Sequence, residues 1–423
     1  MRFVVPSDAT SWVEVANDSH FPIQNLPFGS VDYGSVDASA VIRIGDYVLD
    51  LFELYDNGLL HGEAVSASLD DILDEGGPET LSDIRRQVFE LLRSDNAKLR
   101  DNKGLRERVL RHIDDVDVRV PVTIPAFVDF YSGINHASNV GKMFRPDMPP
   151  LLPNYRHLPV GYNGRASSVV ASGEPVIRPN GQTKGANDEL PTFGPSKELD
   201  FELEMGFFVG KANEMGVPIP IDQVDKYMAG LVLVNDWSAR DVQRWEYQPL
   251  GPFLAKSFAT SISPWIVTLD ALEPFMVKGP SQDPEVLPYL KATKPFHFDV
   301  HLEVWLLTPK MSKPQRICAT NARELYWSMA QQLAHQTCNG TPIDAGDLYA
   351  TGTISGDQSG TFGSLLELTW RGTQPIVMEE TGEERRFLED GDRLTMTGYA
   401  QGPGFRVGFG EVTAEVMPAP SFP

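Results

Sequence analysis

The amino-acid sequence predicts a mainly β protein with two domains. We expect a small barrel-like domain with added helices over residues 1–118 and a large mixed β-sandwich or roll over residues 119–423. From residue 119 onward, short strand-like runs bounded by glycine and proline dominate, among them LVLVND, FDVHLEVWLL and FRVGFGEVTAEV. Many strands with few helices are typical of a sandwich or roll. The run DVDVRVPVTIP, with its two prolines, indicates the crossing between the domains.

In the N-terminal domain, strand-like pieces precede a helical hairpin. Residues 37–52, DASAVIRIGDYVLDLF, have a β-like pattern. An amphipathic helix follows, with Thr80 or Ser82 as its cap, because apolar residues recur at the spacing i, i+4, i+7 and i+8. Its apolar stripe consists of Ile84, Val88, Leu91 and Leu92. A second helix begins at the sequence GLRERVLRHID and is expected to end near Asp114.

The segment LDFELEMGFF, residues 199–208, alternates apolar and acidic side chains with the period of a strand. Asp200, Glu202 and Glu204 share one face. Side chains two apart on such a face lie about 6.5–7 Å from each other, so three like charges repel. Two explanations stay open at this point: the face meets bulk water, as in many antiparallel sheets, or it meets a cation.

Two short helices are expected among the strands of the second domain. Asp222 is placed to cap one that ends at Gly230 and leads into a strand over residues 231–236. Asn321 is placed to cap the other. The inner stripe of this second helix consists of Leu325, Met329 and Leu333.

The charge balance excludes several classes of partner. The 423 residues include 58 acidic residues against 36 Lys and Arg, which leaves a formal net charge of −22. Such a surface repels phosphate backbones and anionic lipids, so we expect no nucleic acid and no membrane as a partner. Cys318 and Cys338 are too few for a disulfide framework, and the sequence shows no secretory leader and no membrane-spanning apolar run. We therefore expect a cytoplasmic protein.

Four acidic residues near strand ends are candidate metal ligands, namely Asp129, Glu202, Glu204 and Asp236. An oxygen-only ligand set suits a hard cation such as Ca²⁺ or Mg²⁺ rather than zinc. A cation would also offset the repulsion along residues 199–208, because buried charge must be paired or metal-bound. Since the four residues are far apart in the sequence, their convergence is a hypothesis.

Other polar residues in the same stretches suit acid–base chemistry and anion binding. Histidine ionises near neutrality, so His136 is a candidate general base, although a lone histidine is more often structural. Arg145 and Arg240 can bind carboxylates through bidentate guanidinium groups. Tyr162 suits either a pocket or the edge of a sandwich. The nucleophile elbow G-x-S-x-G, the P-loop and the G-x-G-x-x-G fingerprint are absent from the sequence.

Several long, ordered motifs closely resemble the fumarylacetoacetate hydrolase family in its full-length, two-domain type. They run nearly from end to end: DSHFPIQNLPFG, FYSGINHASNVGKMFRP, LPVGYNGRASSVV, LDFELEMGFFVG, VNDWSARDVQRWEYQPLGPF, GTISG and DGDRLTMTGYAQGPGFRVGFG. The resemblance implies an SH3-like barrel followed by a β-sandwich roll that carries the site, assembled as a homodimer. It also implies metal-dependent hydrolysis of a carbon–carbon bond in 4-fumarylacetoacetate, a diketo diacid. The products would be fumarate and acetoacetate, at the last step of tyrosine and phenylalanine breakdown.

The resemblance also implies a role for each matching residue. Asp129, Glu202, Glu204 and Asp236 match calcium ligands. Lys256 and Thr260 fall near a second, structural Mg²⁺ site that Asp236 also approaches. His136 matches the general base, with Glu367 as the acid that orients it. The groups that stabilise the developing oxyanion are Arg240, Gln243 and Lys256. The substrate-binding positions are Tyr131, Arg145, Tyr162, Arg240, Gln243, Tyr247 and Thr353. Asp200 matches the family as well, but we expect it to face a different partner.

One departure and two rival functions remain. Where the family usually has GKSFGT, this chain has AKSFAT, with Ala255 and Ala259, which questions the second metal site if a glycine there needs a positive φ. The rival enzyme is a metal-dependent hydrolase or decarboxylase of another β-diketo acid. A catalytically silent scaffold would be expected to have lost His136, Glu367 or a metal carboxylate, and all of these are present.

Overall fold

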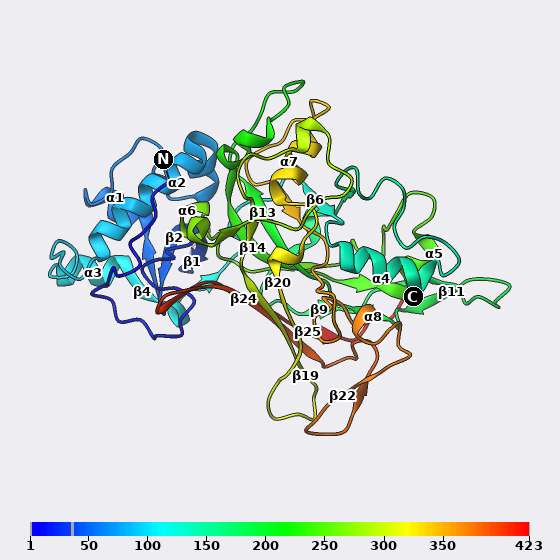
Figure 1. The fold of residues 1–423 in the computed structure, drawn as a ribbon. Helices are drawn as coiled ribbons and strands as arrows, with labels where there is room; N and C mark the ends of the chain where they lie inside the picture. Colours follow the sequence, from blue (N-terminus) through cyan, green and yellow to red (C-terminus); the bar gives the residue numbers. More distant parts are fainter. Residues whose placement is uncertain (1, 35–37, 423) are drawn as a thin grey trace.

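The N-terminal part of the chain forms a five-stranded antiparallel sheet with helices beside it (Figure 1). The computed structural model describes residues 2–34 and 38–422, so Asp37 of the expected strand-like segment lies outside the described residues. The strands lie in the order β4 (Leu110–His112), β3 (Tyr47–Asp50), β2 (Ser39–Ile44), β1 (Phe28–Asp32) and β5 (Asp117–Val118). The helices are α1 (Leu51–Asp56), α2 (Leu69–Leu92) and α3 (Lys103–Val109). The predicted barrel-like domain with added helices is confirmed.

The bounds of two of these helices differ from the prediction. Helix α2 begins after Ser68, whose side chain accepts a hydrogen bond from the amide of Asp71, and not at Thr80 or Ser82. The helix is interrupted at Gly77, whose φ of 64° and ψ of −162° are not helical, so α2 consists of two helical segments, and the second begins at Pro78, in the first turn where proline is tolerated. Helix α3 ends earlier than expected, because the chain becomes extended at residue 110 and pairs with β3 as strand β4.

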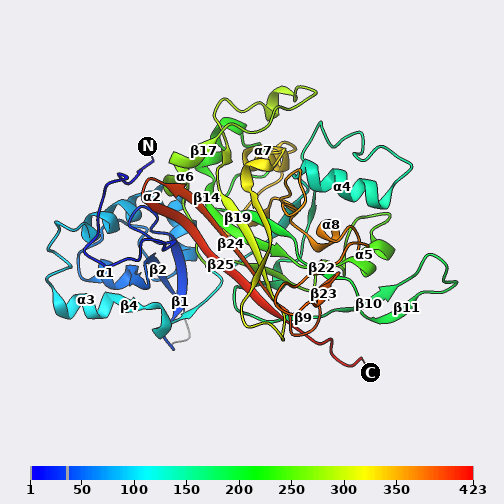
Figure 2. The ribbon, with the colours of Figure 1, turned by 60° about the horizontal axis from the view of Figure 1, so that its bottom comes forward.

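The second domain is built on a seven-stranded mixed sheet and a five-stranded sheet. The first has the order β7 (Gly161–Asn163), β6 (Phe127–Phe130), β21 (Leu348–Ala350), β13 (Leu203–Val209), β14 (Met228–Asp236), β16 (Thr260–Ile262) and β8 (Val169–Ala171). The second has the order β20 (Gln315–Asn321), β19 (His301–Leu307), β24 (Arg393–Gly402), β25 (Phe405–Met417) and β9 (Val176–Ile177). In Figure 2 the long strands β24 and β25 run from the side of the N-terminal domain toward β9. The predicted mixed β-sandwich or roll is confirmed.

Strand β14 of the seven-stranded sheet packs against the five-stranded sheet on one face and against the N-terminal domain on the other. Leu231 and Leu233 pack into the core that the two sheets of the second domain share. Val232 and Val234 point the other way and pack with residues of the N-terminal domain, such as Phe28 and Ile84. Side chains alternate across a strand, so a continuous apolar run serves both cores. The end of β14 at Asp236 is therefore held rigidly from both sides.

Shorter elements complete the domain. Four two-stranded pairs are β10 (Asn180–Thr183) with β11 (Thr192–Pro195), β12 (Leu199–Asp200) with β15 (Ser238–Ala239), β17 (Met276–Val277) with β18 (His297–Phe298), and β22 (Ile376–Val377) with β23 (Glu384–Arg385). The helices are α4 (Ile134–Phe144), α5 (Arg240–Glu246), α6 (Leu269–Leu272), α7 (Met329–Thr337) and α8 (Leu365–Leu368). The β10–β11 hairpin projects away from the body in both views (Figures 1 and 2). Among the described residues, the helices are all too short or too polar to cross a membrane.

Three other sequence-based expectations were wrong in detail. The strand over residues 199–205 is two pieces, β12 and β13, with Phe201 and Glu202 between them. Asp222 lies inside a 3₁₀ helix over Ile221–Lys226, and the next strand already begins at residue 228. Asn321 caps only a single 3₁₀ turn, because a separate capping box of Ser328 and Gln331 begins α7.

Candidate metal and catalytic site

The four candidate metal ligands converge beside inner strands of the seven-stranded sheet. Asp129 comes from β6, Glu204 from β13 and Asp236 from the end of β14, while Glu202 immediately precedes β13. One oxygen of each carboxylate lies within 4.8 Å of the corresponding oxygen of every other. All four side chains are buried, so the alternative of a solvated acidic face does not hold for Glu202 and Glu204.

The electrostatics of this cluster suit a bound cation. Among the described residues, Asp129 Oδ1 and Glu204 Oε1 are buried without a hydrogen-bond partner. Burial first, and then the neighbouring carboxylates, raise the pKa of both side chains well above their ordinary values. Unpaired buried carboxylate oxygens favour a cation that they can ligate. With only oxygen donors present, the residues fit a hard divalent ion such as Ca²⁺ or Mg²⁺.

Lys256 and Thr260 contact the same cluster from the Asp236 side. Lys256 Nζ donates to Asp236 Oδ2 at 2.7 Å and also to Glu202 Oε2. Burial opposes ionisation of Glu202, but Lys256 and then Arg240 outweigh it and lower the pKa of Glu202 to about 2. Thr260 Oγ1 donates to Asp236 Oδ1 at 2.8 Å, and Tyr162 Oη donates to Asp236 Oδ2 at 3.3 Å.

The substitutions Ala255 and Ala259 are accommodated without strain. Both residues are buried, and neither is among the non-glycine residues with positive φ in the described part of the chain. The backbone there does not need glycine. The protonated Lys256 side chain has no lone pair for a metal, so the oxygens for a second ion here would come from Thr260, Asp236 or backbone carbonyl groups.

His136 lies beside the carboxylate cluster and is hydrogen-bonded to Glu367. It sits in the first turn of α4, and its Nδ1 is 2.6 Å from Glu367 Oε2. Its Nε2 faces the cluster, 3.8 Å from Glu202 Oε1. Because a carboxylate accepts the Nδ1 hydrogen, the hydrogen-bond network assigns the tautomer in which Nε2 is free to take a proton.

Glu367 is held by three further donors that sequence reasoning missed. Asn139 Nδ2 donates to Glu367 Oε1 at 2.9 Å, while Ser355 Oγ and Ser364 Oγ each donate to Oε2 at 2.9 Å. Burial opposes its charge, but His136 and the hydrogen bonds from Asn139 and Ser364 lower the pKa of Glu367. Asn139 follows His136 by three residues on α4, so helical spacing could have indicated that both share one face.

Arg240 completes the opposite side of the site. Its Nη1 lies 2.8 Å from Glu202 Oε1 and donates to Gln243 Oε1 at 3.1 Å. Its Nε donates to Asp200 Oδ2 at 2.8 Å, so Asp200 faces a partner other than the cluster, as expected. Arg240 Nη2 is buried without a partner among the described residues, which leaves one cationic donor available to a ligand.

The remaining candidates lie around this centre at different depths. The ring of Tyr131 stands edge-on to His136, with 5.4 Å between ring centroids, and Thr353 is buried with its Oγ1 unpartnered among the described residues. Arg145 is half-buried at the end of α4, where its Nη2 donates to Pro150 O at 3.1 Å. Tyr247 is half-buried one turn beyond Gln243, at the end of α5. The structure therefore places Tyr131 against His136, Thr353 in the buried interior, and Arg145 and Tyr247 at the ends of helices.

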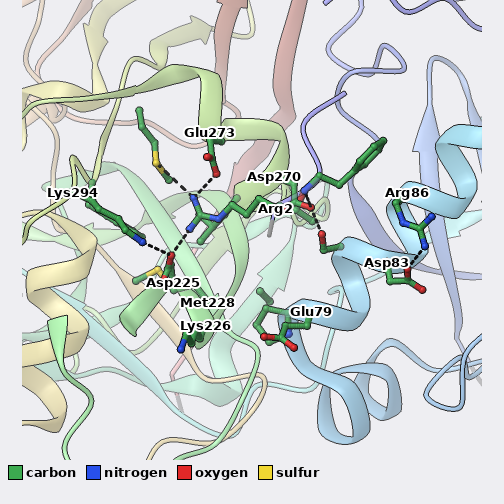
Figure 3. A pocket seen from close by; sticks show the side chains of 18 of the residues that line it. Arg2, Glu79, Asp83, Arg86, Asp225, Lys226, Met228, Asp270, Glu273 and Lys294 are labelled. Atoms are coloured by element: carbon green, nitrogen blue, oxygen red, sulfur yellow. Dashed lines mark hydrogen bonds and ion pairs between the residues drawn. The ribbon is translucent and has the colours of Figure 1, made fainter. Parts of the chain in front are cut away.

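A cavity of about 770 Å³ lies elsewhere, where the first residues and α2 meet the second domain (Figure 3). Its charged side chains are largely paired with one another. Arg2 contacts Asp225 at 3.1 Å and Glu273 at 3.0 Å, and Lys294 also approaches Asp225. The candidate site residues do not line it. It is a cavity with charged walls between the two domains, separate from the carboxylate cluster.

Comparisons with known proteins cover both domains. The family model described as "Fumarylacetoacetase N-terminal" matches residues 24–121, and "Fumarylacetoacetate (FAA) hydrolase C-terminal" matches residues 126–417. The chain is 47% identical to a fumarylacetoacetase of Rattus norvegicus, with 97% of this chain and 99% of the relative covered. It is 46% identical to one of Oryza sativa subsp. japonica, with 98% of each covered. A solved fumarylacetoacetate hydrolase of psychrophilic Exiguobacterium antarcticum, 16% identical, shares the fold with a TM-score of 0.52 over 93% of this chain and 99% of that one. Because the likeness extends through the N-terminal sheet and as far as strand β25, this chain belongs to the fumarylacetoacetate hydrolase family.

Proposed function

We propose that the protein is a fumarylacetoacetase, which hydrolyses a carbon–carbon bond of 4-fumarylacetoacetate to give fumarate and acetoacetate. Relatives of that name share 46–47% identity with it over nearly its whole length. The observation that carries the proposal is the His136–Glu367 pair, whose free Nε2 faces a buried cluster of four carboxylates. We assign the reaction to the last step of tyrosine and phenylalanine breakdown, in the cytoplasm.

Asp129, Glu202, Glu204 and Asp236 would hold a divalent cation, Ca²⁺ or Mg²⁺. When bound, the cation supplies Lewis acidity toward the diketo oxygens of the substrate. The unpartnered oxygens of Asp129 and Glu204 support this assignment. A second, structural Mg²⁺ near Lys256 and Thr260 is a further part of the proposal, and the unstrained alanines at 255 and 259 are compatible with it.

The proton transfer follows from the orientation of His136. Glu367 holds the Nδ1 hydrogen, so Nε2 takes a proton from water as its oxygen attacks the substrate carbonyl carbon. The carbon–carbon bond then breaks, and its electron pair leaves with the acetoacetate carbon, which gains a proton. Arg240, Gln243 and Lys256 stabilise the negative oxygen, because preorganised donors act most strongly in a buried site. The Nη2 group of Arg240 that has no protein partner among the described residues is suited to this role.

The remaining assigned residues would orient the substrate. Its two terminal carboxylates call for cationic and hydroxyl donors at a distance from the reacting carbon. Arg145 supplies the cation at the end of α4, and hydroxyl groups are available around the centre. The assigned hydroxyl donors are Tyr131, Tyr162, Tyr247 and Thr353.

An assay of fumarylacetoacetate cleavage with the purified protein tests both the activity and the metal. We expect turnover that chelation abolishes and that Ca²⁺ or Mg²⁺ restores. Glu202→Gln should lose most activity, because it removes one charge from the ligand set. The control is Glu198→Gln, which alters a nearby carboxylate that pairs with Arg244 outside the cluster. Full activity of metal-free protein would refute the metal site, and cleavage of only another β-diketo acid would refute the substrate.

We also propose that the protein is a homodimer, as the family resemblance implies. Support comes from exposed apolar side chains on the β10–β11 hairpin, the C-terminal segment and the loop after α5. Phe193, Leu250, Phe253 and Phe422 are 55%, 96%, 69% and 71% exposed. Apolar patches of this kind often mark interaction sites. Light scattering should give about twice the 46.8 kDa of one chain, and Leu250→Glu should shift the mass toward the monomer. Met215→Glu, at an 81% exposed residue elsewhere, is the control, and a wild-type monomer at micromolar concentration would contradict the proposal.

A further inference from the structure

Asp200 is a fully buried carboxylate that neither the metal cluster nor the acid–base pair uses. Its oxygens accept four hydrogen bonds. Oδ1 accepts from the amides of Phe201 at 2.8 Å and Leu365 at 2.7 Å. Oδ2 accepts from the amide of Leu366 at 2.9 Å and from Arg240 Nε at 2.8 Å. A carboxylate has about four acceptor positions, so this arrangement leaves Asp200 none for a metal.

These four hydrogen bonds connect helix α8, which carries Glu367, with Arg240 at the start of α5. Leu365 and Leu366 begin helix α8, and the next residue of that helix is Glu367. Arg240 is the first residue of α5 and carries the cationic donor. One side chain therefore fixes both the acid that orients His136 and the guanidinium group opposite it.

The spacing around Glu202 explains why this connection matters. Glu202 Oε1 lies 2.8 Å from Arg240 Nη1 and 3.8 Å from His136 Nε2. His136 and the Arg240 guanidinium group thus both lie close to Glu202 Oε1. A displacement of either by about 1 Å would disturb the attack geometry, and errors of that size can cost roughly 10²-fold in rate.

We propose that Asp200 is a positioning residue that sets the distance between the His136–Glu367 pair and Arg240. This inference rests on the proposed hydrolase function and goes beyond it, since it concerns a residue outside the ligand and acid–base sets. Asp200 would act through Arg240 and α8 without contacting the substrate. Its loss should therefore lower kcat while the metal remains bound.

The test compares Asp200→Asn with Asp392→Asn. Asp392 is also fully buried, accepting from Arg385 Nε at 2.9 Å and from the amide of Glu389 at 2.9 Å, outside the proposed site. Whichever way the new amide at 200 is turned, its NH₂ group faces two N–H donors. We expect both variants to melt at lower temperature and both to bind Ca²⁺ in calorimetry. Only Asp200→Asn should lose kcat, by roughly 10–100-fold, when assayed where both are folded. Equal kcat in the two variants would overturn the proposal.

A second readout does not depend on turnover. The short Nδ1–H contact of His136 with Glu367 should give a downfield proton resonance, assigned by its disappearance in Glu367→Gln. Asp200→Asn should move this resonance or speed its exchange with water, and Asp392→Asn should not. If the wild-type protein does not cleave fumarylacetoacetate, the function fails while the resonance still tests the positioning. An unchanged resonance with unchanged kcat refutes the positioning alone. Should Asp200→Asn not fold, Asp200→Glu keeps the charge but displaces it by one methylene, and wild-type kcat in that variant would equally reject the proposal.

Discussion

At the scale of single residues, the 2.6 Å contact between His136 Nδ1 and Glu367 Oε2 makes the two side chains one functional unit. Removing the imidazole in His136→Ala should lower kcat by roughly 10²–10⁴-fold, the usual contribution of a positioned base. Glu367→Gln should cause a smaller loss, because it removes only orientation and charge stabilisation. The two losses should be strongly non-additive in a double-mutant cycle on kcat. His61→Ala, at an exposed histidine of the N-terminal domain, is the control, and losses that multiply would refute the pair.

Residue patterns predicted candidates for this site but not their contacts. The period-two acids of residues 199–205 drew attention to Glu202 and Glu204, and oxygen-only chemistry pointed to a hard cation. The same pattern could not separate Asp200 from them, because its partners Arg240, Leu365 and Leu366 come from distant segments. The alternative of a solvated acidic face was wrong because segments distant in the sequence cover that face. Burial of a charged face depends on what the rest of the chain packs against it.

At the scale of elements, the segment between β21 and α8 depends on one glycine. Gly352 has φ of 77°, and its amide donates to Glu204 Oε2 at 2.9 Å. A Cβ atom there would lie 2.2 Å from the carbonyl oxygen of Phe130. Gly352→Ala therefore combines a left-handed backbone with a clash against backbone that cannot move freely.

Gly360→Ala is the matched control for this element. Gly360 has φ of 83°, but a Cβ atom at that position would meet nothing within 4 Å. We expect Gly360→Ala to cost about 1 kcal/mol of unfolding free energy, the strain alone, and Gly352→Ala to cost roughly 1–3 kcal/mol more. Urea titration measures both. Equal losses in the two variants would show that the close approach to Phe130 does not constrain this segment.

Element boundaries were predictable where the pattern was local and failed where pairing decided them. The apolar stripe of α2 was evident from its spacing, but the pattern did not reveal the first helical segment, which Ser68 caps and which meets the second at the non-helical Gly77. Residues near 110 left a helical pattern to become β4, since pairing with β3 satisfies their backbone groups. Such partners lie in another part of the chain, and propensity is a weak guide against them.

At the scale of the whole molecule, the docking of the two domains includes a half-buried histidine, His20. The amide of Gly410 on β25 donates to His20 Nδ1 at 3.2 Å, and the amide of Gly408 donates to the carbonyl oxygen of His20 at 2.9 Å. Asn25 Nδ2 donates to Gly408 O at 2.7 Å. The N-terminal segment is thus hydrogen-bonded to strand β25 of the five-stranded sheet. An acceptor nitrogen at this junction makes the contact sensitive to protonation.

The pH dependence of this junction has a definite sign. Burial first, and then Arg406 and Arg43, lower the pKa of His20 from 6.5 to about 4. Between these values the unfolded chain binds the proton and the folded chain does not, so the unfolding free energy should fall as pH falls from 6.5 toward 4, by up to about 3 kcal/mol from this group. His20→Asn should remove part of that dependence, because its Oδ1 can still accept from Gly410 and does not titrate. The measurement is urea unfolding at several pH values, taken as the difference between variant and wild type, so that other titrating groups cancel. A difference that stays constant from pH 7 to pH 4 would show that His20 is not held neutral at the junction.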